Sequence, residues 1–330
     1  MHIVYFDSGT TNTRVYLIAD LQVIDVIKED FGSRDVSITG NDKLLLHNLK
    51  MLYYQLLDKN RLKDIDIERI YASGMVTCPF GITEIPHLST PVSLEKLRDG
   101  IHQHFEQEFF NRSIFLIRGV KTLSEGFPLD TGNIAEVNNV RGEEIESFGL
   151  LSILPHEYAK SNLVVIFPGS HTHIIYLSGG VIKDILSTFS GELYHAIASD
   201  TVFSASIKNA GRELISEMVI LGYECLKKYG FNRAIYIAHA IKIFDVSDNI
   251  GIRSYINGVI SAGMVLALKK TMRKKWRKVE NIIVAGSNDM VYIDEMVLKY
   301  AIKGIRITPI VVSDIDSFAV RGMLEIIKQE

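Results

Sequence analysis

The fold is decided at the start of the chain, by the stretch Ile3-Val4-Tyr5-Phe6-Asp7-Ser8-Gly9-Thr10-Thr11-Asn12-Thr13-Arg14-Val15-Tyr16-Leu17. Two runs of apolar, β-branched and aromatic residues flank a short polar turn, which predicts a hairpin of two buried strands. Gly9 lets the backbone approach a ligand closely, and the N–H groups and threonine hydroxyls of the turn can donate to phosphate oxygens. The turn is therefore a candidate phosphate site.

Asp7 directly precedes this turn, where its carboxylate could bind Mg²⁺ or a water ligand of Mg²⁺. The alternative is that Asp7 only accepts hydrogen bonds from the N–H groups of the turn. The hairpin is not a P-loop, because the chain contains no Gly-x-x-x-x-Gly-Lys-Ser/Thr and the turn leads into a strand.

The composition is that of a compact globular protein large enough for two domains: 330 residues, of which 47% are hydrophobic and 23% charged. A net charge of −3 argues against nucleic-acid binding, and the basic cluster from Lys269 to Lys278 is read as a solvated helix end. Cys78 and Cys225 lie outside any Cys-x-x-Cys motif, so we expect buried thiols in a reducing compartment. With no apolar leader and no apolar window of membrane-spanning length, we expect a cytoplasmic protein without a membrane segment.

Further along the first half, strands and helices alternate. We expect strands at 23–30, 67–75 and 114–117, and helices at 41–59 and from Ser93 to Phe109. Each helix has an expected apolar stripe, which consists of Leu45, Leu49, Leu52 and Leu56 in the first and of Leu94, Leu97, Ile101, Phe105 and Phe109 in the second. A polar loop is expected at Gly32-Ser33-Arg34. This order indicates an α/β domain with a mixed sheet.

The second half repeats the opening pattern. The stretch Leu163-Val164-Val165-Ile166-Phe167-Pro168-Gly169-Ser170-His171-Thr172-His173-Ile174-Ile175-Tyr176-Leu177 again predicts a strand, a turn with glycine and hydroxyl groups, and a strand. Helices are expected within 191–228 and at 255–270, 292–302 and 317–327, with strands at 281–285 and 305–312. Similarity at half the chain length indicates a duplicated domain, although two unrelated glycine hairpins would give the same pattern.

Two such hairpins, followed by a glycine turn after a late strand, resemble the actin, sugar kinase and Hsp70 ATPase superfamily. The resemblance implies two ribonuclease-H-like lobes with mixed sheets and a nucleotide cleft. It implies phosphate binding by Gly9, Thr10 and Thr11 in the first turn and by Gly169, Ser170 and His171 in the second. It places the adenosine at the turn Ala285-Gly286-Ser287, with Gly286 and Ser287 as the binding residues.

Three further motifs narrow the resemblance. They are Arg141-Gly142-Glu143-Glu144 ahead of an expected helix, Phe167-Pro168-Gly169-Ser170-His171, and Thr188-Phe189-Ser190-Gly191-Glu192-Leu193. Together with Ala72-Ser73-Gly74-Met75-Val76 and Asp316-Ser317-Phe318-Ala319-Val320-Arg321-Gly322, they resemble the 2-dehydro-3-deoxygalactonokinase family. That family phosphorylates the C6 hydroxyl of a six-carbon 2-keto-3-deoxy sugar acid. The resemblance implies ATP and Mg²⁺ as cofactors and a small sugar acid as the partner. The chain could also form a homodimer.

The sequence departs from the family pattern at three places. Cys78-Pro79-Phe80-Gly81 stands where the family usually has a Gly-Trp pair, and Met264 stands where it usually has an acidic residue. In the second turn, His173 or its neighbour stands where the family commonly has a lysine. These departures bear on the identity of the sugar more than on ATP binding.

The resemblance also implies roles for individual residues. Asp7 is expected to bind Mg²⁺, and Glu143, or else Glu144, is expected to be the base that activates the hydroxyl, because related kinases have an acidic residue at this helix start. Both glutamates could instead only stabilise the helix dipole. The expected substrate contacts are Asn12, Arg14, Gly74, Met75, Arg141 and Glu192.

Several of these assignments keep an alternative. Arg141 could bind the sugar carboxylate or the transferring phosphoryl group, or could be an ordinary surface arginine. Glu192 could contact the substrate or only the helix dipole. His171 and His173 point to one face of a strand and could share a metal ion, but no third ligand is evident.

We expect an N-terminal lobe over residues 1–145, with the sugar site and first phosphate turn, and a C-terminal nucleotide lobe over 146–330. The last helix, at about 317–327, would pack back on the first lobe. Three other functions stay open: a kinase of another sugar or sugar acid, an actin-like ATPase module that acts on a protein partner, and a sugar-binding protein without catalysis.

Overall fold

The computed structural model describes residues 2–40, 43–79, 81–124, 126–286 and 289–329. The chain forms two compact units. Unit 1 comprises Met1–Ser161, Leu177–Ile185 and Val312–Glu330, and unit 2 comprises Asn162–Tyr176 and Leu186–Val311. The boundary expected after residue 145 lies within a helix of unit 1, α4 (Glu143–Ile153).

Unit 1 is built on a mixed sheet with the strand order β3-β2-β1-β4-β7-β6. The expected hairpin is formed by β1 (His2–Ser8) and β2 (Thr13–Ala19), and β3 (Gln22–Glu29) continues it. β4 (Ile67–Gly74) runs parallel to β1 and places Ser73 opposite Asp7 and Gly74 opposite Ser8. β7 (Arg112–Leu116) and the antiparallel edge strand β6 (His102–Glu106) complete the sheet.

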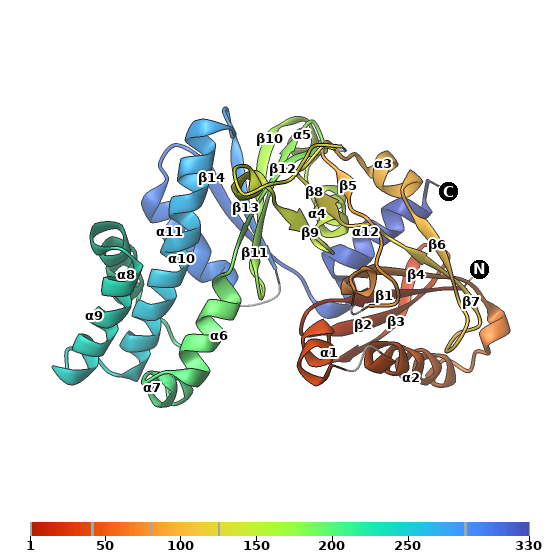
Figure 1. Ribbon diagram of the computed structural model, residues 1–330, viewed down its shortest axis with the longest axis horizontal. Coiled ribbons are helices and arrows are strands. Elements are labelled where there is room, and N and C mark those ends of the chain that lie inside the picture. The colour runs from red at the N-terminus through yellow and green to blue at the C-terminus, as the bar shows by residue number, and fades with distance from the viewer. Residues whose placement is uncertain (1, 41–42, 80, 125, 287–288, 330) are drawn as a thin grey trace. The chain divides into compact units, whose positions relative to one another are not determined.

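Helix α2 (Lys43–Lys59) covers one face of this sheet (Figure 1). Its expected apolar stripe of Leu45, Leu49, Leu52 and Leu56 is buried, because a period of about 3.6 residues places these side chains on one side. A short helix, α1 (Ser33–Thr39), occupies part of the region expected as a polar loop.

The helix expected from Ser93 to Phe109 is wrong beyond Asp99. Helix α3 (Leu94–Asp99) ends at Gly100, and the following residues form β6 along the edge of the sheet. Phe105, which the helical pattern placed on the apolar stripe, is 58% exposed on that edge strand. Pairing with β7 therefore decides the structure of this segment, against the spacing of its apolar residues.

A small second sheet in unit 1 has the order β5-β8-β9 and consists of β5 (Leu88–Ser89), β8 (Val120–Lys121) and β9 (Asn139–Val140). Next to it in the chain, α4 packs closely against the last helix, α12 (Phe318–Ile327). A Cβ atom on Gly149 would lie 2.6 Å from the backbone nitrogen of Gly322, so the two backbones are in contact there. A short helix, α5 (His156–Lys160), precedes the second half of the chain.

The other large sheet has the order β12-β11-β10-β13-β14. Its strands are β10 (Asn162–Phe167), β11 (Thr172–Ser178), β12 (Val181–Thr188), β13 (Asn281–Gly286) and β14 (Arg306–Val311). A hairpin and third strand on one side, and parallel strands on the other, repeat the arrangement of β3-β2-β1-β4-β7. The topology is thus that of the expected duplicated α/β fold.

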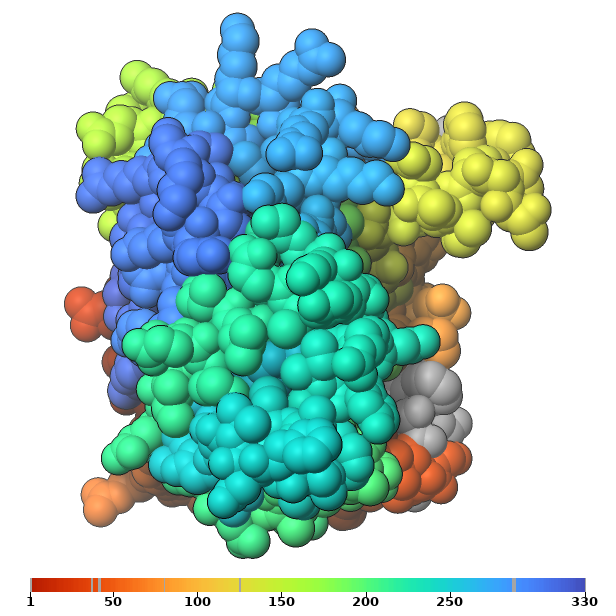
Figure 2. Space-filling model, turned by 90° about the vertical axis from the view of Figure 1, so that its left-hand side faces the viewer, coloured from red at the N-terminus to blue at the C-terminus, as the bar shows by residue number. Residues whose placement is uncertain are grey.

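The helices of unit 2 are α6 (Ser190–Asp200), α7 (Ser204–Lys208), α8 (Ser216–Tyr229), α9 (Phe231–Ile243), α10 (Asn249–Lys274) and α11 (Met290–Ala301). Helices α8 and α9 form much of the surface in Figure 2, and α9 was not expected from the sequence. Among the described residues α10 alone is long and apolar enough to cross a membrane, but its most apolar window is 72% buried inside the protein. Among the described residues, Cys78 and Cys225 form no disulfide, and both are buried, as expected.

Candidate active site

The first turn, Gly9 to Asn12, joins β1 to β2. The N–H of Gly9 donates to the carbonyl of Asn12 at 2.8 Å, which closes the turn. Within the described part of the chain, the N–H groups of Thr10, Thr11 and Asn12 have no hydrogen-bond acceptor. Successive backbone donors of this kind can bind an anion such as a phosphate.

The turn is held from behind by the start of α1. The N–H groups of Ser33 and Arg34 donate to the carbonyls of Gly9 and Thr10, at 3.2 Å and 3.0 Å. A Cβ atom on Gly32 would lie 2.5 Å from the carbonyl oxygen of Thr10, so only glycine allows this approach. The carbonyl groups of Gly9 and Thr10 in the turn therefore point toward the start of α1.

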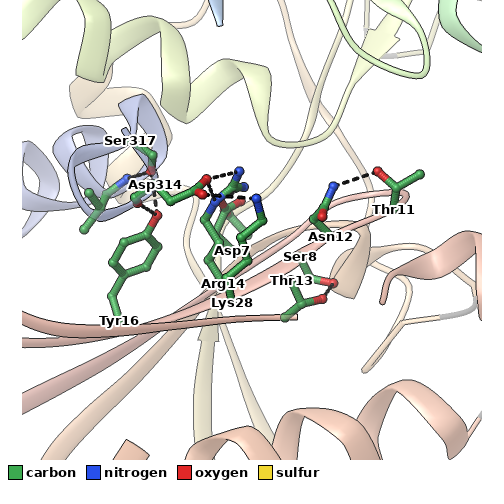
Figure 3. A network of polar contacts seen from close by, with 12 residues as sticks. Asp7, Ser8, Thr11, Asn12, Thr13, Arg14, Tyr16, Lys28, Asp314 and Ser317 are labelled. Atoms are coloured by element: carbon green, nitrogen blue, oxygen red, sulfur yellow. Dashed lines mark hydrogen bonds and ion pairs between the residues drawn. The ribbon is translucent and has the colours of Figure 1, made fainter. Parts of the chain in front are cut away.

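Asp7, at the end of β1, takes part in a polar network that reaches the C-terminal segment (Figure 3). Arg14 lies 3.5 Å from the Asp7 carboxylate and donates from Nε and Nη2 to Asp314 at 2.9 Å and 2.7 Å. Lys28 also pairs with Asp314, at 3.0 Å. Burial raises the pKa of Asp7, and the charge of Arg14 offsets part of this rise.

A cavity of about 130 Å³ opens beside this network, wholly within unit 1. Acidic side chains gather in it: Asp7 from β1, and Glu143 and Glu146 from the first turn of α4. Burial, together with the charges of Glu143 and Asp7, raises the pKa of Glu146 well above the ordinary value of a glutamate. The residues that line the cavity are Asp7, Ser8, Gly9, Thr11, Asn12, Arg14, Gly74, Arg141, Gly142, Glu143 and Glu146.

The two expected candidates for the base have different surroundings. Glu143 lines the cavity, whereas Glu144 is completely buried outside it. Both carboxylate oxygens of Glu144 accept from the N–H of Gly142, at 3.0 Å and 2.8 Å. Burial and the neighbouring charge of Glu143 raise the pKa of Glu144 to about 8. Gly142 has a φ of 118°, a backbone conformation that favours glycine.

Arg141 lies at the border of the cavity. Its guanidinium donates to the hydroxyl of Thr77 at 2.5 Å and to the carbonyl of Ile85 at 3.1 Å, so it is partly fixed by its own unit. Gly74 lines the same cavity, and a Cβ atom there would meet the carbonyl of Ser8 at 2.3 Å. Met75 and Thr10, expected site residues, do not line the cavity.

In unit 2, the second turn joins β10 to β11 and repeats the support seen in unit 1. The N–H of Glu192, at the start of α6, donates to the carbonyl of Ser170 at 2.8 Å. A Cβ atom on Gly191 would lie 2.1 Å from the carbonyl oxygen of Gly169, so glycine is again needed behind the turn. Glu192 lies in the first turn of α6, where its carboxylate also suits the helix dipole.

The two histidines after this turn lie close to each other. The ring centroids of His171 and His173 are 5.8 Å apart, and His173 Nδ1 is 2.9 Å from the hydroxyl of Ser187. The ring of His171 packs against Phe189. Among the described residues, no three His, Cys, Asp or Glu side chains have an arrangement that could hold a metal ion.

The first two residues of the expected adenosine turn, Ala285 and Gly286, are the last two residues of β13. Its third residue, Ser287, lies outside the described residues. Further along the chain, the buried Asp294 of α11 accepts a hydrogen bond from Ser261 of α10 at 2.6 Å. Burial raises the pKa of Asp294 to about 7, and the hydrogen bond from Ser261 opposes this rise.

Sequence reasoning missed three residues of the site. Glu146 follows Glu143 by three residues and therefore lies on the same helix face, a spacing that could have indicated it. Asp314 precedes the quoted motif that begins at Asp316, but nothing in the sequence connects it to Arg14 across 300 residues. The role of Gly32 can be recognised only in the structure, where its Cα lies close to the carbonyl of Thr10 in the first turn.

Comparison with solved structures agrees with this description. A protein from Sinorhizobium meliloti, described as a candidate 2-dehydro-3-deoxygalactonokinase, superposes with a TM-score of 0.75 at 17% identity and covers 99% of this chain and 98% of its own. The activator of the 2-hydroxyisocaproyl-CoA dehydratase from Clostridium difficile, solved with ADPNP, has a TM-score of 0.52 at 10% identity, with 100% and 95% covered. Component A of the (R)-2-hydroxyglutaryl-CoA dehydratase from Acidaminococcus fermentans has a TM-score of 0.52 at 11% identity, with 100% and 98% covered.

At these identities the structural likeness shows the fold, which is the actin-like ATPase fold expected from the sequence. No curated protein matches the chain. The family model of 2-keto-3-deoxy-galactonokinase, however, matches residues 7–326, nearly the whole sequence. The chain therefore belongs to the 2-keto-3-deoxy-galactonokinase family and is a carbohydrate kinase that acts on 2-keto-3-deoxygalactonate.

Proposed function

We propose that the chain transfers the γ-phosphoryl group of ATP to the C6 hydroxyl of 2-keto-3-deoxygalactonate, with Mg²⁺ as the metal cofactor. The observation that carries this proposal is the cavity of unit 1. It combines backbone donors of the first turn with Asp7, Arg14 and Glu143 within one small volume. Phosphoryl transfer needs positioned phosphates, compensation of negative charge and a carboxylate that orients the attacking hydroxyl.

Glu143 is the base in this proposal. Its place in the first turn of α4 supports the role, because its side chain lines the cavity together with Asp7 and the first turn. Glu143 would accept the proton of the C6 hydroxyl as that oxygen attacks phosphorus. Glu144, whose carboxylate oxygens accept hydrogen bonds from the N–H of Gly142, would instead stabilise the start of the helix.

Asp7 is proposed to hold Mg²⁺, directly or through water. The donors present suit this ion, because the cavity gathers several carboxylates. Arg14, which lies 3.5 Å from the Asp7 carboxylate, also pairs with Asp314 and so offsets only part of this negative charge. Mg²⁺ usually takes one or two carboxylates and completes its coordination with phosphate oxygens and water. When bound, the ion would offset the negative charge of the phosphates.

The remaining contacts follow the two turns. We assign phosphate binding to Gly9, Thr10 and Thr11 in unit 1 and to Gly169, Ser170 and His171 in unit 2. The adenosine is assigned to Gly286 and Ser287. We assign the sugar acid to Asn12, Arg14, Gly74, Met75, Arg141 and Glu192, and the structure adds Glu146 as a further carboxylate of the cavity. A cytoplasmic location and a homodimer stay predictions.

The test is an assay of ADP release with Mg-ATP and a panel of acceptors. The panel contains 2-keto-3-deoxygalactonate, its gluconate epimer, hexoses and aldonic acids. We expect turnover on the keto-deoxy acid and its loss in both Asp7→Asn and Glu143→Gln. Turnover only on other sugars would overturn the substrate, and ATP binding without any sugar-dependent ADP release would favour an ATPase that acts on a partner.

A further inference from the structure

The small sheet of unit 1 has one apolar and one polar face. Leu88, Val120 and Val140 pair across its strands and are buried, with exposed fractions of 7%, 0% and 1%. Paired residues point to the same face of a sheet, and neighbours along a strand point to opposite faces. Ser89, Lys121 and Asn139 therefore form a row on the other face.

A second polar row lies just beyond the strand ends and consists of His87, Gly119 and Arg141. The N–H of Leu88 donates to the carbonyl of Gly119 at 2.8 Å, so the pairing continues to this row. A Cβ atom on Gly119 would lie 2.8 Å from both Arg141 Cγ and His87 Cδ2. The absence of a side chain on Gly119 thus lets the Arg141 stem and the His87 imidazole pack closely over the backbone there.

The six residues of the two rows include two cations and no carboxylate, although the charges of Glu144 and Glu84, which lie outside the rows, act on Arg141. The two cations are Lys121 and Arg141, and Arg118 lies at the edge of the face, where its Nε donates to the carbonyl of Pro86 at 2.7 Å. In the described ranges none of these three cations forms an ion pair with an acidic side chain. Unpaired cations that converge on one face favour an anionic ligand.

The neutral groups of the face suit a polar ligand as well. Burial, followed by the charges of Arg141, Lys121 and Arg118, lowers the pKa of His87 to about 4, so its ring is neutral at pH 7. His87 Nε2 lies 3.5 Å from Asn139 Nδ2. The hydroxyl of Ser89 is buried and has no hydrogen-bond partner among the described residues, which is costly unless a ligand or water provides one.

We propose that this face, formed by His87, Ser89, Lys121, Asn139 and Arg141 around Gly119, binds the carboxylate end of the sugar acid. Arg141 connects it to the cavity, since it lies in the polar row and also lines the cavity with Glu143. The acid would thus have its carboxylate among the cations and its terminal hydroxyl near the base. This inference rests on the proposed function and adds the residues that select an acid over a neutral sugar.

The test compares 2-keto-3-deoxygalactonate with its uncharged C1 amide, the amide measured as a substrate or as a competitive inhibitor. Lys121→Gln should raise the KM of the acid about tenfold, which corresponds to about 1.4 kcal/mol. It should leave the KM or inhibition constant of the amide, the KM of ATP and kcat within twofold of the values for the unaltered enzyme. Lys121→Arg, which keeps the charge, should restore the KM, and Lys63→Gln, at an exposed lysine of the same unit, should have no effect.

His87→Ala is a second variant in case Lys121→Gln does not fold, and it should also raise the KM of the acid. An unchanged KM for the acid in both folded variants would overturn the subsite, as would equal losses for acid and amide. If the unaltered enzyme turns over no acid, the proposed function fails. If the unaltered enzyme turns over the acid and the KM of the acid is unchanged in both variants, only the proposed subsite is overturned.

Discussion

Glu143 and Glu144 are neighbours in the sequence, but only Glu143 faces the cavity. Glu143→Gln keeps the size of the side chain and removes its basicity, so kcat should fall by about 10²-fold or more. The KM of ATP should stay within about twofold, because no nucleotide contact is removed. Steady-state ADP release with 2-keto-3-deoxygalactonate measures both constants.

Glu144→Gln is the matched control. Its amide oxygen can still accept from the N–H of Gly142, and the replaced carboxyl has a pKa of about 8, so little charge is lost at pH 7. We expect kcat within about fivefold of the unaltered enzyme. A greater loss in Glu144→Gln than in Glu143→Gln, with both proteins folded, would assign the base to Glu144.

Asp294 should make unit 2 less stable as the pH rises. Its pKa is about 7 in the folded protein against 3.8 for a free side chain, because the carboxyl is buried. Between about pH 4 and pH 7 the folded state keeps a proton that the unfolded state has lost. The free energy of unfolding therefore falls with pH, by about 1.4 kcal/mol per unit from this group.

Asp294→Asn removes this titration and leaves an oxygen that can accept from Ser261. Relative to the unaltered protein, the variant should gain stability from pH 5 to pH 8, and the gain should level off above pH 7. Urea unfolding of both proteins at pH 5, 6, 7 and 8 measures the difference, in which all other titrating groups cancel. Parallel pH profiles would show that Asp294 does not titrate as its burial implies.

At the scale of elements, the contact between α4 and α12 determines where Glu143 is held. A Cβ atom on Gly149 would lie within 3 Å of backbone atoms of Phe318 and Gly322, which cannot move as a side chain can. Gly149→Ala should push the helices apart and lower the free energy of unfolding by about 1–3 kcal/mol. Thermal unfolding measures this loss, and kcat should fall as well because α4 carries Glu143.

Gly263→Ala, in the middle of α10, provides the opposite control. No atom lies within 4 Å of the Cβ position there, so the substitution only improves helix propensity. We expect a gain of about 0.5–1 kcal/mol. If Gly149→Ala were as stable as the unaltered protein, the close approach of the two helices would be wrong.

The elements that the sequence predicted are those whose pattern is local. The hairpin of β1 and β2 and the stripe of α2 follow from alternation and helical period within one segment. The prediction for the segment after Asp99 was wrong because the spacing of its apolar residues suited a helix, whereas in the structure it pairs with β7 as a strand. In the site, Asp7 and Glu143 were indicated by motifs, but the link from Arg14 to Asp314 depends on tertiary contact and leaves no trace in either segment.

At the scale of the whole molecule, the order β12-β11-β10-β13-β14 of one large sheet repeats the order β3-β2-β1-β4-β7 in the other, and each sheet has a glycine behind its turn. Gly32 lies behind the turn of unit 1 and Gly191 behind that of unit 2. If both turns bind the nucleotide, a disturbance of either should remove the stabilisation that Mg-ATP gives to the chain. A ligand at about 100 times its Kd stabilises a folded protein by about 2.7 kcal/mol.

We therefore expect Mg-ATP to raise the unfolding temperature of the unaltered protein and to have little effect on Gly32→Ala or Gly191→Ala. In each variant the added Cβ would meet a backbone oxygen of the turn, at 2.5 Å and 2.1 Å, so the turn must shift. Gly211→Ala, where no atom lies within 4 Å, should respond as the unaltered protein does. Each variant is compared with itself without nucleotide, so a loss of intrinsic stability does not imitate a loss of binding. EDTA should abolish the shift if Mg²⁺ is required, and a full shift in Gly191→Ala would remove the second turn from the nucleotide site.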